Sequence, residues 1–197
     1  EQSANLAIAV KELQACIESA TGAKLPIVSG KIRSPAIVIG NCDEARAQGL
    51  DGGKMPVEGF EIKTAADRVF IVGNEGVVDE ASKTSSDGTA WGVAEFLERI
   101  VGVRWYWPRD RGGRSVIPKA DLVVKPVWLA DAPVFRKRVY YPPGAPSRPI
   151  DGKMQNFRPL CTMLRAANSW PISLRVHQPS DWGRNDDYRQ NRPEIFQ

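Results

Sequence analysis

The stretch from Asp87 to Pro108 reads DGTAWGVAEFLERIVGVRWYWP and carries most of the information about the fold. It predicts a helix that begins at Ser86 or Asp87, whose short polar side chains can cap free amides. The helix runs to about Val101, where Gly102 ends it. At about 100° per residue, apolar and charged side chains fall on opposite faces. The apolar face holds Ala90, Val93, Phe96, Leu97, Ile100 and Val101, and the charged face holds Glu95, Glu98 and Arg99.

Trp91 falls among the charged residues of this helix. A large indole is rarely left fully exposed, so its position indicates a partner surface, which we expect to be the segment after residue 125. The alternative is a ring that lies flat over neighbouring aliphatic side chains. On the first interpretation, Trp91 is an interdomain residue.

Two further tryptophans belong to the strand predicted over Val103–Trp107. Strand alternation directs Trp105 and Trp107 to one face and Tyr106 to the other. Sugars stack on exposed aromatic rings, so this face could be a carbohydrate platform. The interpretation that we favour places Trp105 and Trp107 in the core or in the seam between two parts of the chain.

The remaining pattern predicts a first helix over Ala4–Thr21, ended by Gly22, and several strands. The predicted strands are Lys24–Val28, Ala36–Gly40, Gly59–Thr64, Arg68–Gly73, Val103–Trp107, Ser115–Ile117 and Leu122–Val124. We expect Ala36–Gly40 to be central and the third and fourth strands to form a hairpin. Cys42–Pro56 has the composition of a long surface connection. This order predicts an α+β fold, a mixed β-sheet with two helices packed on one face.

The character of the chain changes after Lys125, where prolines become frequent. We therefore predict an α+β domain over residues 1–125, with the boundary near 125–133, and a separate segment over 126–197. Within that segment the pattern predicts a strand over Phe135–Tyr141, a helix over Leu160–Asn168 and a strand over Ile172–Val176. These elements are too few to form a core of their own. Residues 1–125 should fold without them.

Composition lends no support to several classes of function, although charge alone does not decide between them. The net charge of +4 would permit a nucleic-acid partner, but the lysines and arginines are scattered rather than gathered into one stripe. There is no apolar run approaching the roughly 20 residues that cross a membrane. Cys16, Cys42 and Cys161 form no metal-ligand cluster, and their odd number rules out complete internal pairing. The chain also has no glycine-rich nucleotide loop, so we expect no metal and no cofactor.

The stretch Asp87–Pro108, together with Thr21–Pro26, resembles the accessory domain that precedes the barrel in family-20 β-hexosaminidases and family-67 α-glucuronidases. It looks closest to a related group of bacterial hydrolases of unassigned specificity. In these proteins a Gly-Thr-x-x-Gly-Val helix leads into an aromatic strand, and an earlier amphipathic helix ends in Thr-Gly-Ala-x-Leu-Pro. The resemblance covers roughly Ala4 to Pro118. It implies a secreted or periplasmic glycoside hydrolase that binds carbohydrate through the complete protein, with this domain contacting the catalytic barrel.

The segment Asp131-Ala-Pro-Val-Phe-Arg-Lys-Arg138 resembles the Asp-x-Pro-x-Phe-x-x-Arg start of the first barrel strand in family-20 enzymes. In that family the arginine reaches the sugar, so the resemblance makes Arg138 a candidate for substrate binding. Val139 departs from the family, which has a glycine there. The alternative for Arg138 is a salt-bridged strand residue without a sugar-binding role.

The last part of the chain looks like the early barrel of the unassigned hydrolase group, so 126–197 is expected to be a linker and the incomplete start of a (β/α)8 barrel. His177, the single histidine, follows the strand predicted over Ile172–Val176. Barrel enzymes place ligand-binding side chains at such strand ends, so His177 is the second candidate for substrate binding. The alternative is a structural or solvent-exposed histidine.

The sequence offers no catalytic pair. Glycoside hydrolysis usually needs two carboxyl groups about 5–10 Å apart. In the families resembled, this pair lies on middle barrel strands, which are absent from these 197 residues. We therefore expect a non-catalytic part of a larger enzyme, inactive alone. Two alternatives remain, an autonomous carbohydrate-binding module and a basic nucleic-acid-binding domain.

Overall fold

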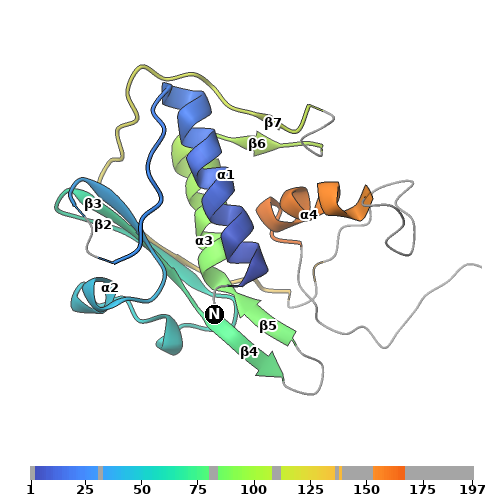
Figure 1. Ribbon diagram of the computed structural model, residues 1–197. Coiled ribbons are helices and arrows are strands. Elements are labelled where there is room, and N and C mark those ends of the chain that lie inside the picture. The colour runs from blue at the N-terminus through green and yellow to red at the C-terminus, as the bar shows by residue number, and fades with distance from the viewer. Residues whose placement is uncertain are drawn as a thin grey trace, which may run out of the picture.

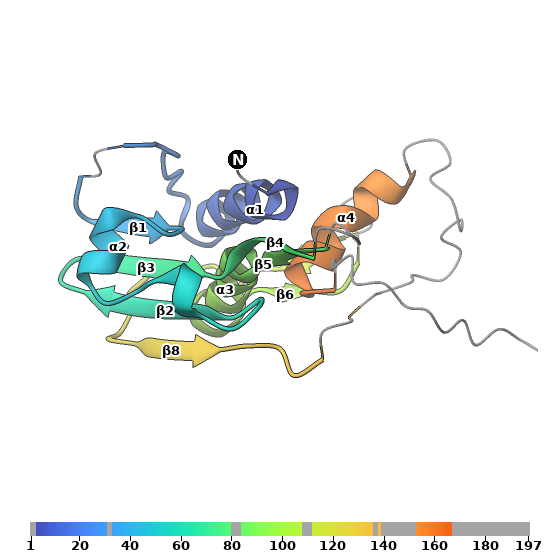
Figure 2. The ribbon, with the colours of Figure 1, turned by 90° about the horizontal axis from the view of Figure 1, so that it is seen from below.

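The computed structural model describes residues 3–30, 33–79, 84–107, 112–135, 138 and 153–166. They form an α+β fold built on a mixed sheet (Figures 1 and 2). The helices are α1 (Ala4–Thr21), α2 (Asp43–Ala47), the 3-10 turn η1 (Gly52–Lys54), α3 (Gly88–Phe96), the π-helical turn η2 (Leu97–Val101) and α4 (Lys153–Met163). The strands are β1 (Ala36–Ile39), β2 (Phe60–Ala65), β3 (Arg68–Gly73), β4 (Glu75–Asp79), β5 (Thr84–Asp87), β6 (Arg104–Trp105), β7 (Arg114–Ser115) and β8 (Trp128–Asp131).

The main sheet has the strand order β1, β3, β2, β8. β1 runs parallel to β3, whereas β2 is antiparallel to both β3 and β8. Helices α1 and α3 cover one face, as predicted, where Ile62 and Ile71 belong to the main core (Figure 2). The other face carries α2 and a smaller core in which Phe70 contacts Leu50 and its neighbours. Alternation along β3 therefore buries both of its faces.

The helix predicted over Ala4–Thr21 is confirmed with the same bounds. The Ser3 hydroxyl accepts a hydrogen bond from the Leu6 amide at 3.0 Å, which caps the first turn. Gly22 ends the helix in a left-handed conformation, with φ of +77°. α1 packs beside α3 along much of its length (Figure 1).

The helix predicted from Ser86 or Asp87 to Val101 is also confirmed, as α3 followed by η2. Its Gly-Thr-x-x-Gly sequence fits it closely against the sheet. A Cβ on Gly88 would lie 2.2 Å from the carbonyl oxygen of Gly59, and one on Gly92 would lie 2.9 Å from Ile71. The Thr89 hydroxyl accepts the Gly73 amide at 2.9 Å. The motif is thus explained by close packing of helix on sheet.

Several sequence predictions about strands are wrong. Ala36–Gly40 forms an edge strand, because β3 takes the central place between β1 and β2. Lys24–Val28 and Leu122–Val124 have strand-forming residues but no ladder partner, so both run as coil. Cys42–Pro56 contains α2 and η1, and Leu50 is buried there, so it is more than a surface connection.

Other strands are confirmed in part or were missed. The hairpin of Gly59–Thr64 and Arg68–Gly73 is confirmed as β2 and β3. Val103–Trp107 and Ser115–Ile117 are represented by the short pair β6 and β7. The β4–β5 pair and β8 were not predicted.

The chain beyond residue 125 packs on the preceding part. β8 pairs with β2, so the sheet extends to Asp131, and α4 contacts α1 and α3. The division of the chain at residue 125 stays a prediction. The helix predicted over Leu160–Asn168 begins earlier and ends at Met163. Most of the strand predicted over Phe135–Tyr141, and all of Ile172–Val176, lies outside the described residues. In the described part of the chain no helix has the length and apolar character needed to span a membrane.

Candidate functional site

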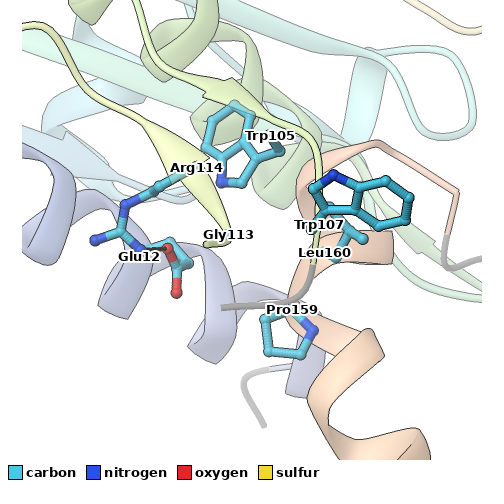
Figure 3. A pocket seen from close by; sticks show the side chains of 7 residues that line it. All are labelled: Glu12, Trp105, Trp107, Gly113, Arg114, Pro159 and Leu160. Carbon is cyan, nitrogen blue, oxygen red and sulfur yellow. Dashed lines mark hydrogen bonds and ion pairs between the residues drawn. The ribbon is translucent and has the colours of Figure 1, made fainter. Parts of the chain in front are cut away.

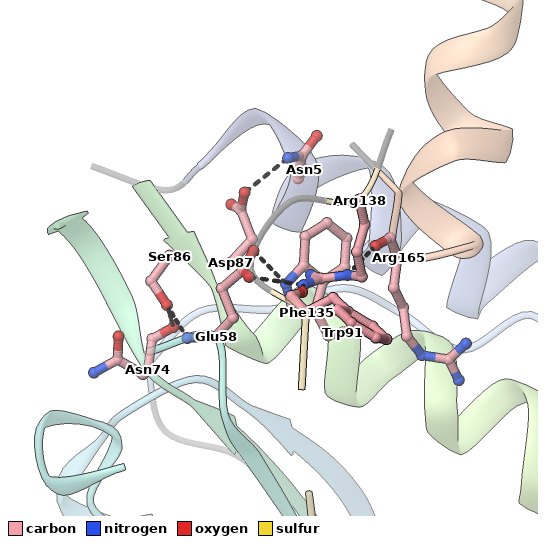
Figure 4. Close-up of polar contacts among 9 residues, drawn as sticks. All are labelled: Asn5, Glu58, Asn74, Ser86, Asp87, Trp91, Phe135, Arg138 and Arg165. Atoms are coloured by element: carbon pink, nitrogen blue, oxygen red, sulfur yellow. Dashed lines mark hydrogen bonds and ion pairs between the residues drawn. The ribbon is translucent and has the colours of Figure 1, made fainter. Parts of the chain in front are cut away.

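Three side chains from distant parts of the sequence meet on α3 and form what we call the anchor cluster: Glu58, Trp91 and Arg138 (Figure 4). Glu58 is 1% exposed, and its Oε2 lies 3.0 Å from Nη1 of Arg138. Its Oε1 accepts a hydrogen bond from Nε1 of Trp91 at 3.2 Å. The Arg138 guanidinium also lies over the Trp91 ring, 5.9 Å from its centroid. One buried carboxylate therefore binds both an indole and a guanidinium.

The backbone around Glu58 is held in an unusual conformation. Glu58 directly precedes Gly59 and β2 and has a φ of +59°, which is unfavourable for a residue with a side chain. Its amide donates to the Ser86 hydroxyl at 2.6 Å, and that hydroxyl donates to the Asn74 carbonyl at 2.8 Å. The end of β5 and the β3–β4 connection thus hold Glu58 so that its carboxylate binds Trp91.

A second arginine extends the anchor cluster to the end of α4. The Arg165 carbonyl accepts a hydrogen bond from Nε of Arg138 at 2.8 Å. Its guanidinium forms ion pairs with Glu95 and, at 2.9 Å, with Glu98, both on the helix α3–η2. The chain after residue 125 therefore covers part of the helix face that the sequence predicted to be charged, while the Arg99 side chain stays 61% exposed. This explains why Trp91 is buried although it lies among charged residues.

A third contact joins the two ends of the described chain. Asn5, on α1, donates to the Asp87 carboxylate at 2.8 Å and accepts from the Thr162 hydroxyl of α4 at 3.3 Å. All three side chains are buried. The Asp87 side chain makes no capping bond to α3, contrary to the sequence prediction. α1, α3 and α4 are thereby fastened together by hydrogen bonds as well as by apolar packing.

On the side where β6 and β7 meet α1 and α4 lies an aromatic hollow (Figure 3). Its lining comprises Glu12, Trp105, Trp107, Gly113, Arg114, Pro159 and Leu160. Both tryptophans line it, in agreement with the prediction that they share a face. Trp107 is 55% exposed, whereas Trp105 packs partly against the main core. Glu12 and Arg114 form an ion pair of 2.7 Å, largely buried.

The carboxylates in these two places are bound by donors from the protein itself. The carboxylate of Glu58 is engaged by two donors, and that of Glu12 by the Arg114 guanidinium. Burial raises the pKa of the Cys161 thiol, which keeps that thiol protonated at neutral pH. The described residues hold no group of three histidine, cysteine, aspartate or glutamate side chains that could bind a metal ion.

The sequence-predicted site residues have different outcomes. Arg138 forms the ion pair that was the alternative to sugar binding, and its sugar-binding role stays a prediction. Trp91 contacts Arg138, as expected of a residue facing the chain after 125, and also belongs to the main core. The interdomain role predicted for Trp91, Trp105 and Trp107 stays a prediction. His177 lies outside the described residues.

The sequence analysis missed the partners of these residues. Glu58 and Arg165 gave no signal, because an isolated acid or base in a sequence does not indicate its partner. The same holds for Glu12 and Arg114, which are 102 residues apart. Comparison of the chain with protein family models, with curated proteins and with solved structures found no match.

Proposed function

We propose that this chain is the non-catalytic N-terminal part of a secreted glycoside hydrolase, in which the α+β domain holds the segment leading into a catalytic barrel. The observation that supports the proposal most is the anchor cluster. Arg138 closes the Asp131–Arg138 segment, whose sequence resembles the start of a barrel strand, and it is bound to Glu58 and Trp91 of the preceding domain. Such a contact fixes the direction in which the chain leaves the domain.

The wider geometry agrees with a supporting role. Among the described residues, the arginines after residue 125 pair with acids before it, Arg138 with Glu58 and Arg165 with Glu95 and Glu98. Paired and buried charges are suited to fixing one arrangement of two chain segments. The complete enzyme would act on a polysaccharide or glycan and would need no cofactor.

The anchor cluster predicts the effect of Arg138→Met. This change keeps much of the aliphatic side chain but leaves the Glu58 carboxylate buried without its cation. We expect a loss of about 2–3 kcal/mol in the free energy of unfolding of the complete chain. This is below the roughly 3–5 kcal/mol found for fully buried pairs, because the Arg138 side chain is 20% exposed. Urea unfolding followed by circular dichroism measures it.

Arg46→Met is the matched control, because Arg46 also pairs with an acid, Asp43, but the two side chains are 46% and 97% exposed. Exposed pairs contribute about 0–1 kcal/mol. Equal effects of the two substitutions would show that the Glu58–Arg138 contact does not hold the segment in place.

The function itself is tested on the product of the complete reading frame. The coding sequence beyond Gln197 is expected to add strand–helix units of a barrel, including two carboxyl residues at strand ends. The complete product should hydrolyse at least one member of a panel of aryl glycosides, whereas the 197-residue chain should hydrolyse none. A stop codon directly after Gln197, or turnover by the 197-residue chain alone, would contradict the proposal.

A further inference from the structure

We propose that a cleft between the helices and the sheet, which we call the interlayer cleft, binds an extended segment of a partner protein. The bound segment would lie as an added strand beside residues 122–124, with apolar side chains at alternate positions and a basic residue at one end. The cleft has a volume of about 690 Å³, within the range typical of ligand sites. It shares no residue with the anchor cluster or the aromatic hollow, so the inference does not depend on the proposed function.

The interlayer cleft lies between the C-terminal ends of α1 and α3 and the strands that they cover (Figure 1). Its apolar walls come from both layers: Ile17 of α1 and Phe96 of α3, and Ile37 of β1 and Val69 of β3. The turn between β2 and β3 and the coils of residues 23–25 and 120–126 contribute the rest of the lining, all of it within the described chain. An apolar side chain that enters the cleft is therefore removed from water between two layers.

Both coils show the side-chain alternation of a strand. Leu122 and Val124 are half-buried and line the cleft, whereas Val123 between them is 77% exposed. In the other coil, Ala23 and Leu25 line the cleft and the residue between them does not. Such alternation is typical of an extended chain, and both coils lie in stretches rich in strand-forming residues. The two coils therefore resemble strands that lack a neighbour.

The backbone of residues 122–124 is available for pairing. The Thr64 amide of β2 donates to the Val127 carbonyl at 2.9 Å, and the Val127 amide donates to the Thr64 hydroxyl at 2.8 Å. β2 ends at Ala65, directly after this contact. Within the described chain, the amides and carbonyls of residues 122–124 make no hydrogen bond to another backbone group. Unpaired edges of this kind accept an added strand from another chain.

The charge at the rim of the cleft favours a basic residue in the partner. Asp67 and Asp121 line the cleft, are exposed, and form no salt bridge within the described part of the chain. Arg68 also lines it, but its guanidinium is paired with the Glu44 carboxylate. The two aspartates therefore attract a cation. A small apolar molecule could use the walls but would leave the backbone of residues 122–124 unpaired, so the observations favour a peptide strand.

The probe is the peptide acetyl-Lys-Val-Thr-Val-Thr-Val-amide, whose valines can enter the cleft while its threonines face water. It is titrated into the complete 197-residue chain, and hydrogen exchange at the amides of residues 122–124 is followed by NMR. In the free chain these amides should exchange fast. The bound peptide should slow their exchange about tenfold or more, with a Kd of about 1 mM or tighter.

Modified peptides test the mode of binding. In an added strand, the amides of either the valines or the threonines face the neighbouring strand. N-methylation of one of these two sets should therefore weaken binding about tenfold or more, whereas N-methylation of the other set should have little effect. Replacement of the lysine by glutamate should also weaken binding, because Asp67 and Asp121 would repel the new carboxylate.

Ala120→Trp tests the place of binding, because Ala120 lines the cleft and an indole there would fill part of it. This change should weaken binding about tenfold or more. Ala47→Trp is the matched control, since Ala47 is exposed at the end of α2, on the other face of the sheet. It should leave the affinity unchanged. Circular dichroism verifies that both variants are folded.

The proposal is overturned if the peptide leaves amide exchange unchanged at about 10 mM, or if N-methylation of neither set weakens binding. It is also overturned if Ala47→Trp weakens binding as much as Ala120→Trp. Slow exchange at residues 122–124 in the free chain would show that the chain's own residues already pair there, which leaves no place for a partner. Equal binding of the glutamate peptide would refute the role of the two aspartates.

Discussion

Replacing Trp91 by alanine should lower the free energy of unfolding of the complete chain by about 3–5 kcal/mol, as is typical for a tryptophan removed from a well-packed site. The residue is 1% exposed and belongs to the main core. The change also removes a hydrogen-bond donor to Glu58 and the ring beneath the Arg138 guanidinium. Chemical unfolding of both proteins at the same pH and salt measures the difference.

Two variants separate the contributions of Trp91. Trp91→Phe keeps an aromatic ring but loses the indole N–H, so it should cost less than Trp91→Ala. Combining Trp91→Ala with Arg138→Met in a double-mutant cycle should give a coupling energy of about 1 kcal/mol, the size expected for a partly buried cation–π contact. Strict additivity would mean that Trp91 stabilises only the core and takes no part in holding the downstream segment.

Gly88→Ala should be at least as damaging, with an expected loss of about 3 kcal/mol or more, at the upper end of the range for overpacking. The new Cβ would lie 2.2 Å from the Gly59 carbonyl oxygen and 2.7 Å from the Asn74 amide nitrogen. These are backbone atoms of the residue before β2 and of the β3–β4 connection, so neither can turn away as a side chain would. The start of α3 would have to move off the sheet. Thermal unfolding of the purified variant shows whether it does.

Gly53→Ala is the control for Gly88→Ala. A Cβ on Gly53 would meet only the Asp51 carboxylate, at 3.4 Å, which is ordinary contact with a mobile side chain. Gly53→Ala should therefore change stability by less than about 0.5 kcal/mol. If Gly88→Ala proves equally mild, the tight approach of α3 to the sheet is not required for the fold.

The sequence predicted the two long helices because each carries its own signals: apolar spacing, a polar residue before the first turn and a glycine after the last. It could not place β1 at the edge of the sheet, because strand order depends on pairings that local patterns do not encode. Ala36–Ile39 is apolar on both faces, which is typical of a central strand. In the fold, those faces are covered by a helical layer on each side of an edge strand.

Less of the candidate site than of the fold could be predicted from the sequence. The conflict between Trp91 and its charged neighbours did indicate a covering surface, and α3 is covered there by Arg138 and Arg165. The partner on the other side, Glu58, is set by a backbone turn with positive φ that a glutamate seldom adopts. Local patterns predict glycine at positions with positive φ, so they gave no indication that the Glu58 carboxylate would be part of the site.

The contacts that close the structure also join residues far apart in the order of synthesis. Glu58 and Arg138 are 80 residues apart, Arg114 and Glu12 are 102 apart, and Thr162 and Asn5 are 157 apart. A ribosome that has completed α3 at Phe96 has already made Glu58 and Trp91. The arginine that covers them, Arg138, is added about 42 residues later, which takes about 2–8 seconds at the usual elongation rates. During that interval the side chains of Trp91 and Glu58 lack their contact with Arg138 in the nascent chain. Folding of this protein should therefore finish late. The packing of α4 on α1 can form only after nearly all of the described chain has been synthesised.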